Sequence, residues 1–135
     1  MSTPDHDAVL AMNACFYAAF DDKDLNAMGT VWSSEAEVTC VHPGWPPIRG
    51  QEAVMASWKA IFKGDGDAPT CDGPSCHVHG DSAYVLCRER LGGAVLIATN
   101  VFARENGAWV LVHHHASPLA RVPATPDMDP EFLPN

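Results

Sequence analysis

The sequence has few basic residues: eight lysines and arginines stand against 17 aspartates and glutamates, which gives a net charge of −9. The basic residues form no dense cluster. Proteins bind phosphate backbones chiefly through patches rich in lysine and arginine. The sequence therefore argues against a nucleic-acid partner.

Long hydrophobic runs are also absent from the sequence. A membrane-spanning helix needs about 18 or more consecutive apolar residues, and no segment approaches this length. The first residues, MSTPDHDAV, lack the basic and apolar parts of a secretory signal. We expect a cytoplasmic protein that does not enter a membrane.

Cysteine occurs in an odd number, with five residues in all. An odd number in a chain without an export signal argues against a disulfide framework, so we expect reduced thiols. Cys71 and Cys76 have the spacing of half a zinc site, but no second cysteine pair follows to complete it. We predict neither a structural metal site nor a cofactor.

The composition is that of a single folded domain. The chain has 135 residues, of which 47% are hydrophobic and 19% charged, and this length suits one hydrophobic core. The last 15 residues contain four prolines and predict an extended segment. We place the domain at residues 1–120 and a proline-rich tail at residues 121–135.

Three segments in the first half of the chain have the pattern of helices that bury one face. Thr3 and Pro4 are typical of a cap and a first turn, and Asp24 can cap a short second helix over residues 24–32. A third helix begins after Gly50. The apolar residues at helical spacing are Val9, Met12, Phe16 and Phe20 in the first helix and Val54, Met55, Trp58, Ile61 and Phe62 in the third.

The rest of the chain has the alternation and the turn residues of strands. Residues 35–41 are predicted to be extended, whereas segments 42–50 and 64–74 are predicted to be loops because they are rich in proline and glycine. The pairs Gly92-Gly93 and Asn106-Gly107 favour tight hairpin turns, which need positive φ. These turns separate three strands of an antiparallel meander, at residues 83–91, 94–104 and 108–118.

This order of elements predicts an α+β fold. Helices gathered on one face of a curved antiparallel sheet make a two-layer structure, in which three helices close a cone-shaped sheet. A cone of this kind encloses a cavity, and ligands bind preferentially in such concave sites.

Three stretches of sequence resemble a known superfamily. They are FYAAFDDKDLNAM, HPGWPPIRGQEAVMASW and NGAWVLVHHHASP, of which the last two are the more specific. Through them the chain resembles the SnoaL-like group of the nuclear-transport-factor-2-like superfamily over residues 5–118. The resemblance implies the cystatin-like α+β cone. The last stretch also resembles the association domain of calcium/calmodulin-dependent kinases.

Ketosteroid isomerase belongs to the same superfamily, so its catalytic positions can be compared with this chain. The resemblance places the oxyanion-hole tyrosine at Phe16, beside Tyr17, the catalytic base at Cys40 and the protonated aspartate at Asn100. None of these three positions carries the isomerase's functional group. Proton transfer next to a carbonyl needs a base and oxyanion donors, so steroid isomerisation by that mechanism is disfavoured, although Asn100 can donate a hydrogen bond.

Three consecutive histidines lie in the last predicted strand, WVLVHHHASP. Alternate residues of a strand share a face, so His113 and His115 should lie on the side of Trp109, and His114 on the other side. The resemblance makes the Trp109 side the cavity side. Three interpretations stay open: hydrogen-bonded core or rim residues, a polar pocket wall, or a metal site in which His42 is a third ligand.

The predicted strand 83–91 carries charges that are unusual for a central strand. Arg88 and Arg90 alternate with Glu89. Either Arg88 faces the cavity and binds an anion, or a partner subunit covers this face and pairs its charges. The choice stays open, because the Gly-Gly turn and the family register differ by one residue.

Together these observations predict a homodimeric protein that binds a small apolar or cyclic molecule. As an enzyme it would carry out acid–base chemistry on a carbonyl or cyclic compound, with His113 or His115 as base and Asn100 as oxyanion donor. The alternative is a non-catalytic binding or oligomerisation domain. The residues predicted to line the pocket are Phe16, Tyr17, Trp32, Cys40, His42, Trp58 and Arg88.

Overall fold

The computed structural model describes residues 3–120. The proline-rich segment that we predicted as a tail, residues 121–135, lies outside the described residues. No helix in the described part of the chain is long and apolar enough to cross a membrane.

The helices begin where their capping residues predict. The helices of the described chain are α1 (Pro4–Asp22), α2 (Leu25–Val31) and α3 (Gln51–Lys63). The Thr3 hydroxyl accepts the His6 backbone N–H at 3.1 Å, and the Asp24 carboxylate accepts the Ala27 backbone N–H at 3.0 Å. Both caps satisfy donors that a helix start otherwise leaves unpaired. Lys23, with φ of 52°, ends α1 in the left-handed region.

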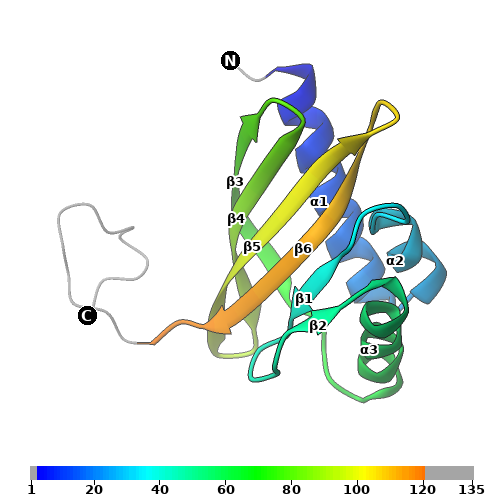
Figure 1. Ribbon diagram of the computed structural model, residues 1–135. Coiled ribbons are helices and arrows are strands. Elements are labelled where there is room, and N and C mark those ends of the chain that lie inside the picture. Colours follow the sequence, from blue (N-terminus) through cyan, green and yellow to red (C-terminus); the bar gives the residue numbers. More distant parts are fainter. Residues whose placement is uncertain (1–2, 121–135) are drawn as a thin grey trace, which may run out of the picture.

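The strands of residues 3–120 form a six-stranded sheet in the order β2-β1-β6-β5-β4-β3. Strand β1 pairs with β6 in parallel, and the other neighbours are antiparallel. The sheet is curved, with α1 crossing one face and α2 and α3 beside β1 and β2 (Figure 1). This arrangement confirms the predicted fold class. The strands are β1 (Thr39–Val41), β2 (Ile48–Arg49), β3 (Thr70–His79), β4 (Ser82–Leu91), β5 (Ala94–Glu105) and β6 (Ala108–Pro118).

Three of the predicted boundaries were wrong. Strand β2 lies inside the segment 42–50, which was predicted as a loop. Strand β3 starts at Thr70, inside the segment predicted as a loop, because a β-bulge between Asp72 and Ser75 accommodates the Gly-Pro pair of that segment. Strand β1 is shorter than predicted. The Ser33 hydroxyl accepts the backbone N–H groups of residues 35 and 36, which holds the chain in a turn there.

Both predicted hairpin turns are confirmed. The strands β4 and β5 meet through Leu91 opposite Ala94, so that two glycines form the turn. The turn between β5 and β6 has Asn106 and Gly107 at φ of 52° and 81°. Positive φ at both central positions matches the right-handed twist of the flanking strands.

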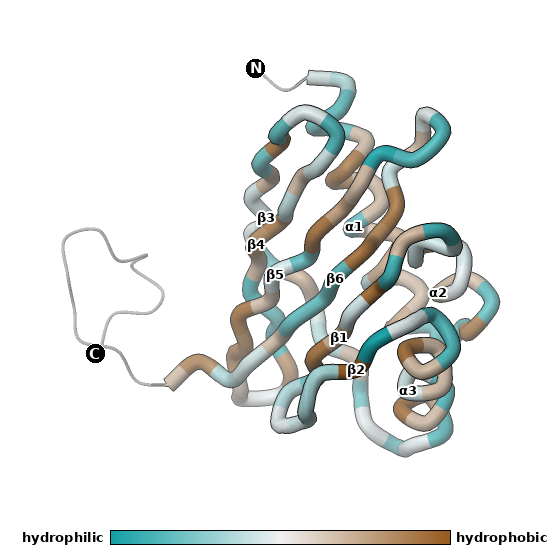
Figure 2. Tube along the Cα trace, viewed as in Figure 1, coloured by the Kyte–Doolittle hydropathy of each residue, from teal (hydrophilic) through white to brown (hydrophobic). Residues whose placement is uncertain are grey.

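The hydrophobic core lies between the helices and the inner face of the sheet. Figure 2 shows apolar residues along β5, β6 and α3, interrupted by polar ones. The largest completely buried side chains are Trp58, Phe16, Phe102, Met28 and Leu111. They come from all three helices and from two strands, so the core joins the two layers.

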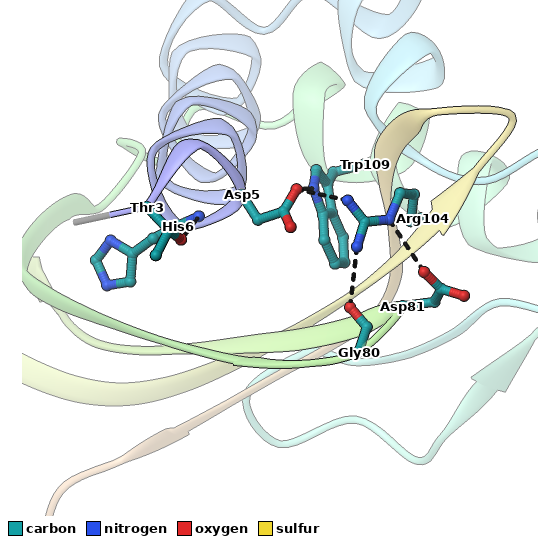
Figure 3. Close-up of polar contacts among 7 residues, drawn as sticks. All are labelled: Thr3, Asp5, His6, Gly80, Asp81, Arg104 and Trp109. Atoms are coloured by element: carbon teal, nitrogen blue, oxygen red, sulfur yellow. Dashed lines mark hydrogen bonds and ion pairs between the residues drawn. The ribbon is translucent and has the colours of Figure 1, made fainter.

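An arginine joins α1 to the turn between β3 and β4 (Figure 3). The guanidinium of Arg104 contacts the carboxylates of Asp5 at 2.5 Å and Asp81 at 3.1 Å, and it donates to the Gly80 carbonyl at 3.1 Å. It also lies 4.7 Å from the centre of the Trp109 ring. Through these contacts the Arg104 side chain links β5 to the start of α1 and to the turn between β3 and β4.

Candidate active site

A β-bulge in β6 decides which histidine enters the interior. Leu111 pairs with Phe102 and His113 pairs with Val101, so that Val112 is an extra residue without a partner on β5. One extra residue in a strand shifts the alternation of all residues that follow it.

The bulge reverses the faces that we predicted for the three histidines. Trp109 and Leu111 point inward as expected, but beyond the bulge the inward side chains are His114 and Ala116. His114 is 1% exposed. His113 and His115 lie on the outer face of the sheet, so their predicted position on the cavity side was wrong.

A cavity of about 240 Å³ lies between α1, α3 and the inner face of the sheet. Its buried polar groups are His42, Glu89 and His114, and Lys23 and Asp67 belong to its wall as well. The remaining walls are mostly apolar: Phe20, Pro43, Trp45, Ile61, Phe62, Pro69, Leu91 and Leu96. Such a site suits a small, largely apolar ligand that carries one or two polar groups.

A chain of hydrogen bonds joins Glu89 to His114 through two other side chains. The Tyr17 hydroxyl donates to Glu89 Oε2 at 2.6 Å, and the Asn100 amide nitrogen donates to the Tyr17 oxygen at 3.2 Å. His114 Nδ1 lies 2.5 Å from Asn100 Oδ1. The chain links α1, β4, β5 and β6, and its two ends, Glu89 and His114, line the cavity.

The network fixes the tautomer of His114. The Asn100 amide nitrogen already donates to Asn13 Oδ1 at 2.8 Å and to Tyr17, so Asn100 Oδ1 is the acceptor for His114. Nδ1 of His114 therefore carries the proton, and Nε2 keeps its lone pair. A neutral imidazole of this tautomer can accept a proton at Nε2.

His42 is held in the opposite tautomer. The Ser57 hydroxyl donates to the Val54 carbonyl at 2.6 Å, so it accepts from His42 Nε2 at 2.9 Å. The His42 ring packs edge-on against Trp58, with 4.7 Å between the ring centres. The rings of His42 and His114 lie 6.5 Å apart, so the cavity presents two ordered imidazoles.

Burial controls the protonation of these groups. It lowers the pKa of His42 to about 4, and together with the neighbouring histidines it lowers the pKa of His114 to about 3. Burial raises the pKa of Glu89, against the opposing effect of the Tyr17 hydrogen bond. The cavity therefore holds two imidazoles that are neutral near pH 7 and a carboxyl group that keeps its proton to higher pH than an ordinary glutamate.

Of the predicted pocket residues, His42 lines this cavity, and several others belong to the core behind its wall. Phe16 packs on the His114 ring, with 4.9 Å between centres. Trp32 is buried beside Leu111. Cys40 is buried with its sulfur 3.6 Å from His42 Nε2, and burial raises its pKa to about 12. A protonated thiol of this kind acts as a small apolar side chain.

Arg88 does not line the cavity, so this prediction was wrong. Arg88 and Arg90 lie on the outer face of β4 and form ion pairs with Asp72, at 3.7 Å and 2.8 Å. Glu89 lies between them and therefore points inward, where it is 2% exposed. Glu89 was not predicted as a site residue. Strand alternation places it on the face opposite the two arginines, but the sequence left open which of the two faces is the inner one.

The described residues contain no group of three or more His, Cys, Asp or Glu side chains placed to hold a metal ion. His113 and His115 share the outer face, with 6.3 Å between ring centres. His42 is on the inner side, so it cannot complete a site with them.

The comparison with protein families agrees with the fold. A model of the SnoaL-like domain matches residues 9–121. The chain belongs to the SnoaL-like family. This SnoaL-like chain is also 32% identical over 120 residues to the F-box protein SKIP8 of Arabidopsis thaliana, a match that covers 82% of the chain and 49% of the relative. It thus spans about half the length of that curated relative.

Two solved structures are similar to this SnoaL-like chain in both sequence and fold. A candidate dehydratase of the NTF2-like family from Streptomyces avermitilis has 32% identity and a TM-score of 0.79, covering 87% of this chain and 99% of that one. A candidate calcium/calmodulin-dependent protein kinase type II association domain from Thiobacillus denitrificans has 31% identity and a TM-score of 0.68, covering 89% and 98%. One is described as an enzyme and the other as an assembly domain.

Proposed function

We propose that this SnoaL-like protein binds a small carbonyl or cyclic compound in the cavity and moves a proton on it. Glu89 is the proton donor and His114 the base. The observation that carries the proposal is the placement of a buried carboxyl and a neutral imidazole in one mostly apolar cavity, joined by hydrogen bonds through Tyr17 and Asn100. Groups with oppositely shifted pKa values are typical of acid–base pairs.

The proposed step uses both ends of the network. His114 Nε2 removes a proton from the carbon next to the ligand's carbonyl, and the Glu89 carboxyl donates its proton to the developing oxyanion. The product is an enol. In a β,γ-unsaturated ketone, the His114 proton moves to the γ-carbon, the enol returns its proton to Glu89, and the double bond has shifted. In a β-hydroxy ketone, the hydroxyl takes the His114 proton and leaves as water, the enol returns its proton to Glu89, and the product is an α,β-unsaturated ketone. Similarity to the candidate dehydratase supports the second outcome.

Asn100 takes a different part in this proposal from the one expected. Its amide nitrogen is occupied by Asn13 and Tyr17, and its oxygen by His114. We therefore assign it as a positioning residue that fixes the His114 tautomer, rather than as an oxyanion donor. His113 and His115 stand outside the cavity and serve as control positions.

Proton–deuterium exchange tests the proposal without a known substrate. The purified protein is incubated in D₂O with small cyclic ketones such as cyclopentanone and cyclohexanone, and proton NMR follows exchange next to the carbonyl. We expect exchange above the buffer rate and a loss of about 100-fold or more in Glu89→Gln and in His114→Asn, the usual size of an acid–base contribution. His113→Asn and His115→Asn should keep the wild-type rate. Equal rates in all four variants would refute the assignment.

A second function, assembly through the sheet, has its own support. The outer face of β5 and β6 carries the partly exposed apolar residues Ile97, Val101, Val110 and Val112, and one similar structure is described as an association domain. We propose a homodimer that buries this face. Our proposal places the protein in the cytoplasm, a reducing setting that the odd number of cysteines favours.

Mass measurement in solution tests the dimer. Light scattering after gel filtration should give twice the chain mass for the wild type and the single-chain mass for Val101→Glu, because a buried carboxylate without a partner opposes association. Lys59→Glu is the matched control, because Lys59 is an exposed residue of α3. This variant should stay dimeric. A wild-type protein of single-chain mass would rule out this function.

A further inference from the structure

A second groove lies between α1 and β3, with Tyr17 in its wall. Its volume is about 490 Å³. The Cys71 side chain, which is half-buried, forms part of its wall. The other lining residues are Leu10, Asn13, Ala14, Tyr17, Asp21, Pro69, Thr70 and Pro74. A small molecule in this groove therefore reaches the Cys71 sulfur directly.

A second thiol lies behind Cys71. Cys87 on β4 is buried and interacts with Cys71 through a side-chain hydrogen bond. Cys71 pairs with Glu89 across the ladder, so Cys87 is its diagonal neighbour on the inner face. Diagonal neighbours in a regular ladder are too far apart for a disulfide. The ladder is not regular here, because a β-bulge follows Asp72, and the side-chain hydrogen bond places the two thiols next to each other.

The two thiols have different surroundings. The hydrogen bond with Cys87, and a second from the Asn13 amide at 3.7 Å, lower the pKa of Cys71. The bond with Cys71 and burial raise the pKa of Cys87. The thiolate is the reactive form of cysteine. Cys71, which is accessible and has the lower pKa, is therefore the nucleophile, and the buried Cys87 is the second thiol to react.

We propose that Cys71 and Cys87 form a redox-active dithiol that exchanges with small disulfides of the glutathione type entering the second groove. The Cys71 thiolate attacks one sulfur of the disulfide, which forms a mixed disulfide and releases one thiolate. Cys87 loses its proton to this released thiolate and attacks Cys71. The Cys71–Cys87 disulfide forms and a second thiolate leaves. The protein loses two electrons and two protons, and the small disulfide becomes two thiols.

Peptide mapping by mass spectrometry tests the dithiol. The full-length protein is treated with glutathione disulfide, quenched with acid and digested without reduction. We expect an internal Cys71–Cys87 disulfide to form at least about 10-fold faster than glutathione adds to Cys15, an exposed thiol without a neighbouring cysteine. Dithiothreitol should reverse it.

Two substitutions separate the roles of the thiols. Cys87→Ser should accumulate a stable glutathione adduct at Cys71, and Cys71→Ser should leave Cys87 unmodified because the groove does not reach it. Cys76→Ser is the control and should react like the wild type. Circular dichroism checks the fold of each variant. The comparison of Cys71 with Cys15 uses the wild-type protein and does not depend on the variants. Modification of Cys15 ahead of Cys71, or a disulfide that joins Cys71 to Cys76, would overturn the proposal.

Discussion

His113 and His114 are neighbours in the chain, yet they lie in different environments. His113 is half-buried on the outer face, where its Nδ1 lies 2.6 Å from the Thr39 hydroxyl. His114 is buried on the inner face, bonded to Asn100 and packed on Phe16. Burial lowers the pKa of both histidines, but only His114 reaches about 3. Neighbouring residues of a strand face opposite sides, and the extra residue, Val112, decides that His114 and not His113 is the inward one.

Alanine substitution of an inward and an outward histidine should give the largest difference in the free energy of unfolding. His114→Ala removes a buried ring and leaves Asn100 Oδ1 without its donor, so we expect a loss of about 2–4 kcal/mol in the free energy of unfolding. His115→Ala, on the exposed side, should change it by no more than about 0.5 kcal/mol. Urea unfolding at pH 7 measures both. Similar losses would mean that the two side chains share one environment.

The pH dependence of stability should also distinguish the histidines. The pKa of His114 is about 3 in the folded chain against an ordinary value of 6.5, so unfolding takes up a proton between these values. The stabilisation is complete above pH 6.5 and is lost as the pH falls toward 3.

His114→Asn keeps a donor for Asn100 but cannot bind this proton. Its stability should therefore fall less on acidification than that of the wild type, whereas His115→Asn should follow the wild type. Urea midpoints at several pH values between 3 and 7 make the comparison. Parallel curves for all three proteins would contradict the buried, neutral His114.

Glu89 should give a pH effect of opposite sign. Its pKa is raised in the folded protein, so its contribution is complete below the ordinary value of 4.5 and is lost as the pH rises through the folded value. Glu89→Gln can still accept the Tyr17 hydroxyl and has no charge to bury. The variant should match the wild type at acid pH and gain relative stability as the pH rises. Thermal melts from pH 4 to 8 show this, and a constant difference would refute it.

Deletion of Val112 should leave the inward face of β6 unchanged. Without this residue, regular alternation still places Trp109, Leu111 and His114 on the inner face. We expect a folded protein, destabilised by about 1 kcal/mol through the altered outer face. Nitrogen NMR shifts of the histidine rings should still show the imidazole of His114 neutral to low pH, beside that of His42. Loss of that signal would mean that the bulge does more than insert one residue.

Local features of this fold were predictable because they depend on residues close in sequence. Thr3 and Asp24 cap their helices, and Asn106 with Gly107 makes its turn, without help from distant parts of the chain. His42 was predicted to line the cavity, and it does. The position of the other polar groups depends on strand pairing, which no local pattern records.

The two errors in the site have the same physical origin. The face of His113 depends on whether β6 matches β5 residue for residue, and the mismatch at Val112 appears only when the strands pair. The face of Arg88 was left open for a similar reason, a difference of one residue in register. Period-two alternation is a strong guide within an unbroken strand, and a single bulge reverses its result.

The parallel pairing of β1 with β6 has a consequence for synthesis of the protein. In the sheet β6 lies between β1 and β5, although β1 leaves the ribosome some 70 residues earlier, since Cys40 pairs with His114. Until the last strand emerges, β1 lacks its main partner and β5 is an open edge, which is the condition in which nascent chains aggregate. The cavity acquires the imidazole of His114 in the same final step, so a chain stopped short of β6 has neither the complete sheet nor the complete cavity wall.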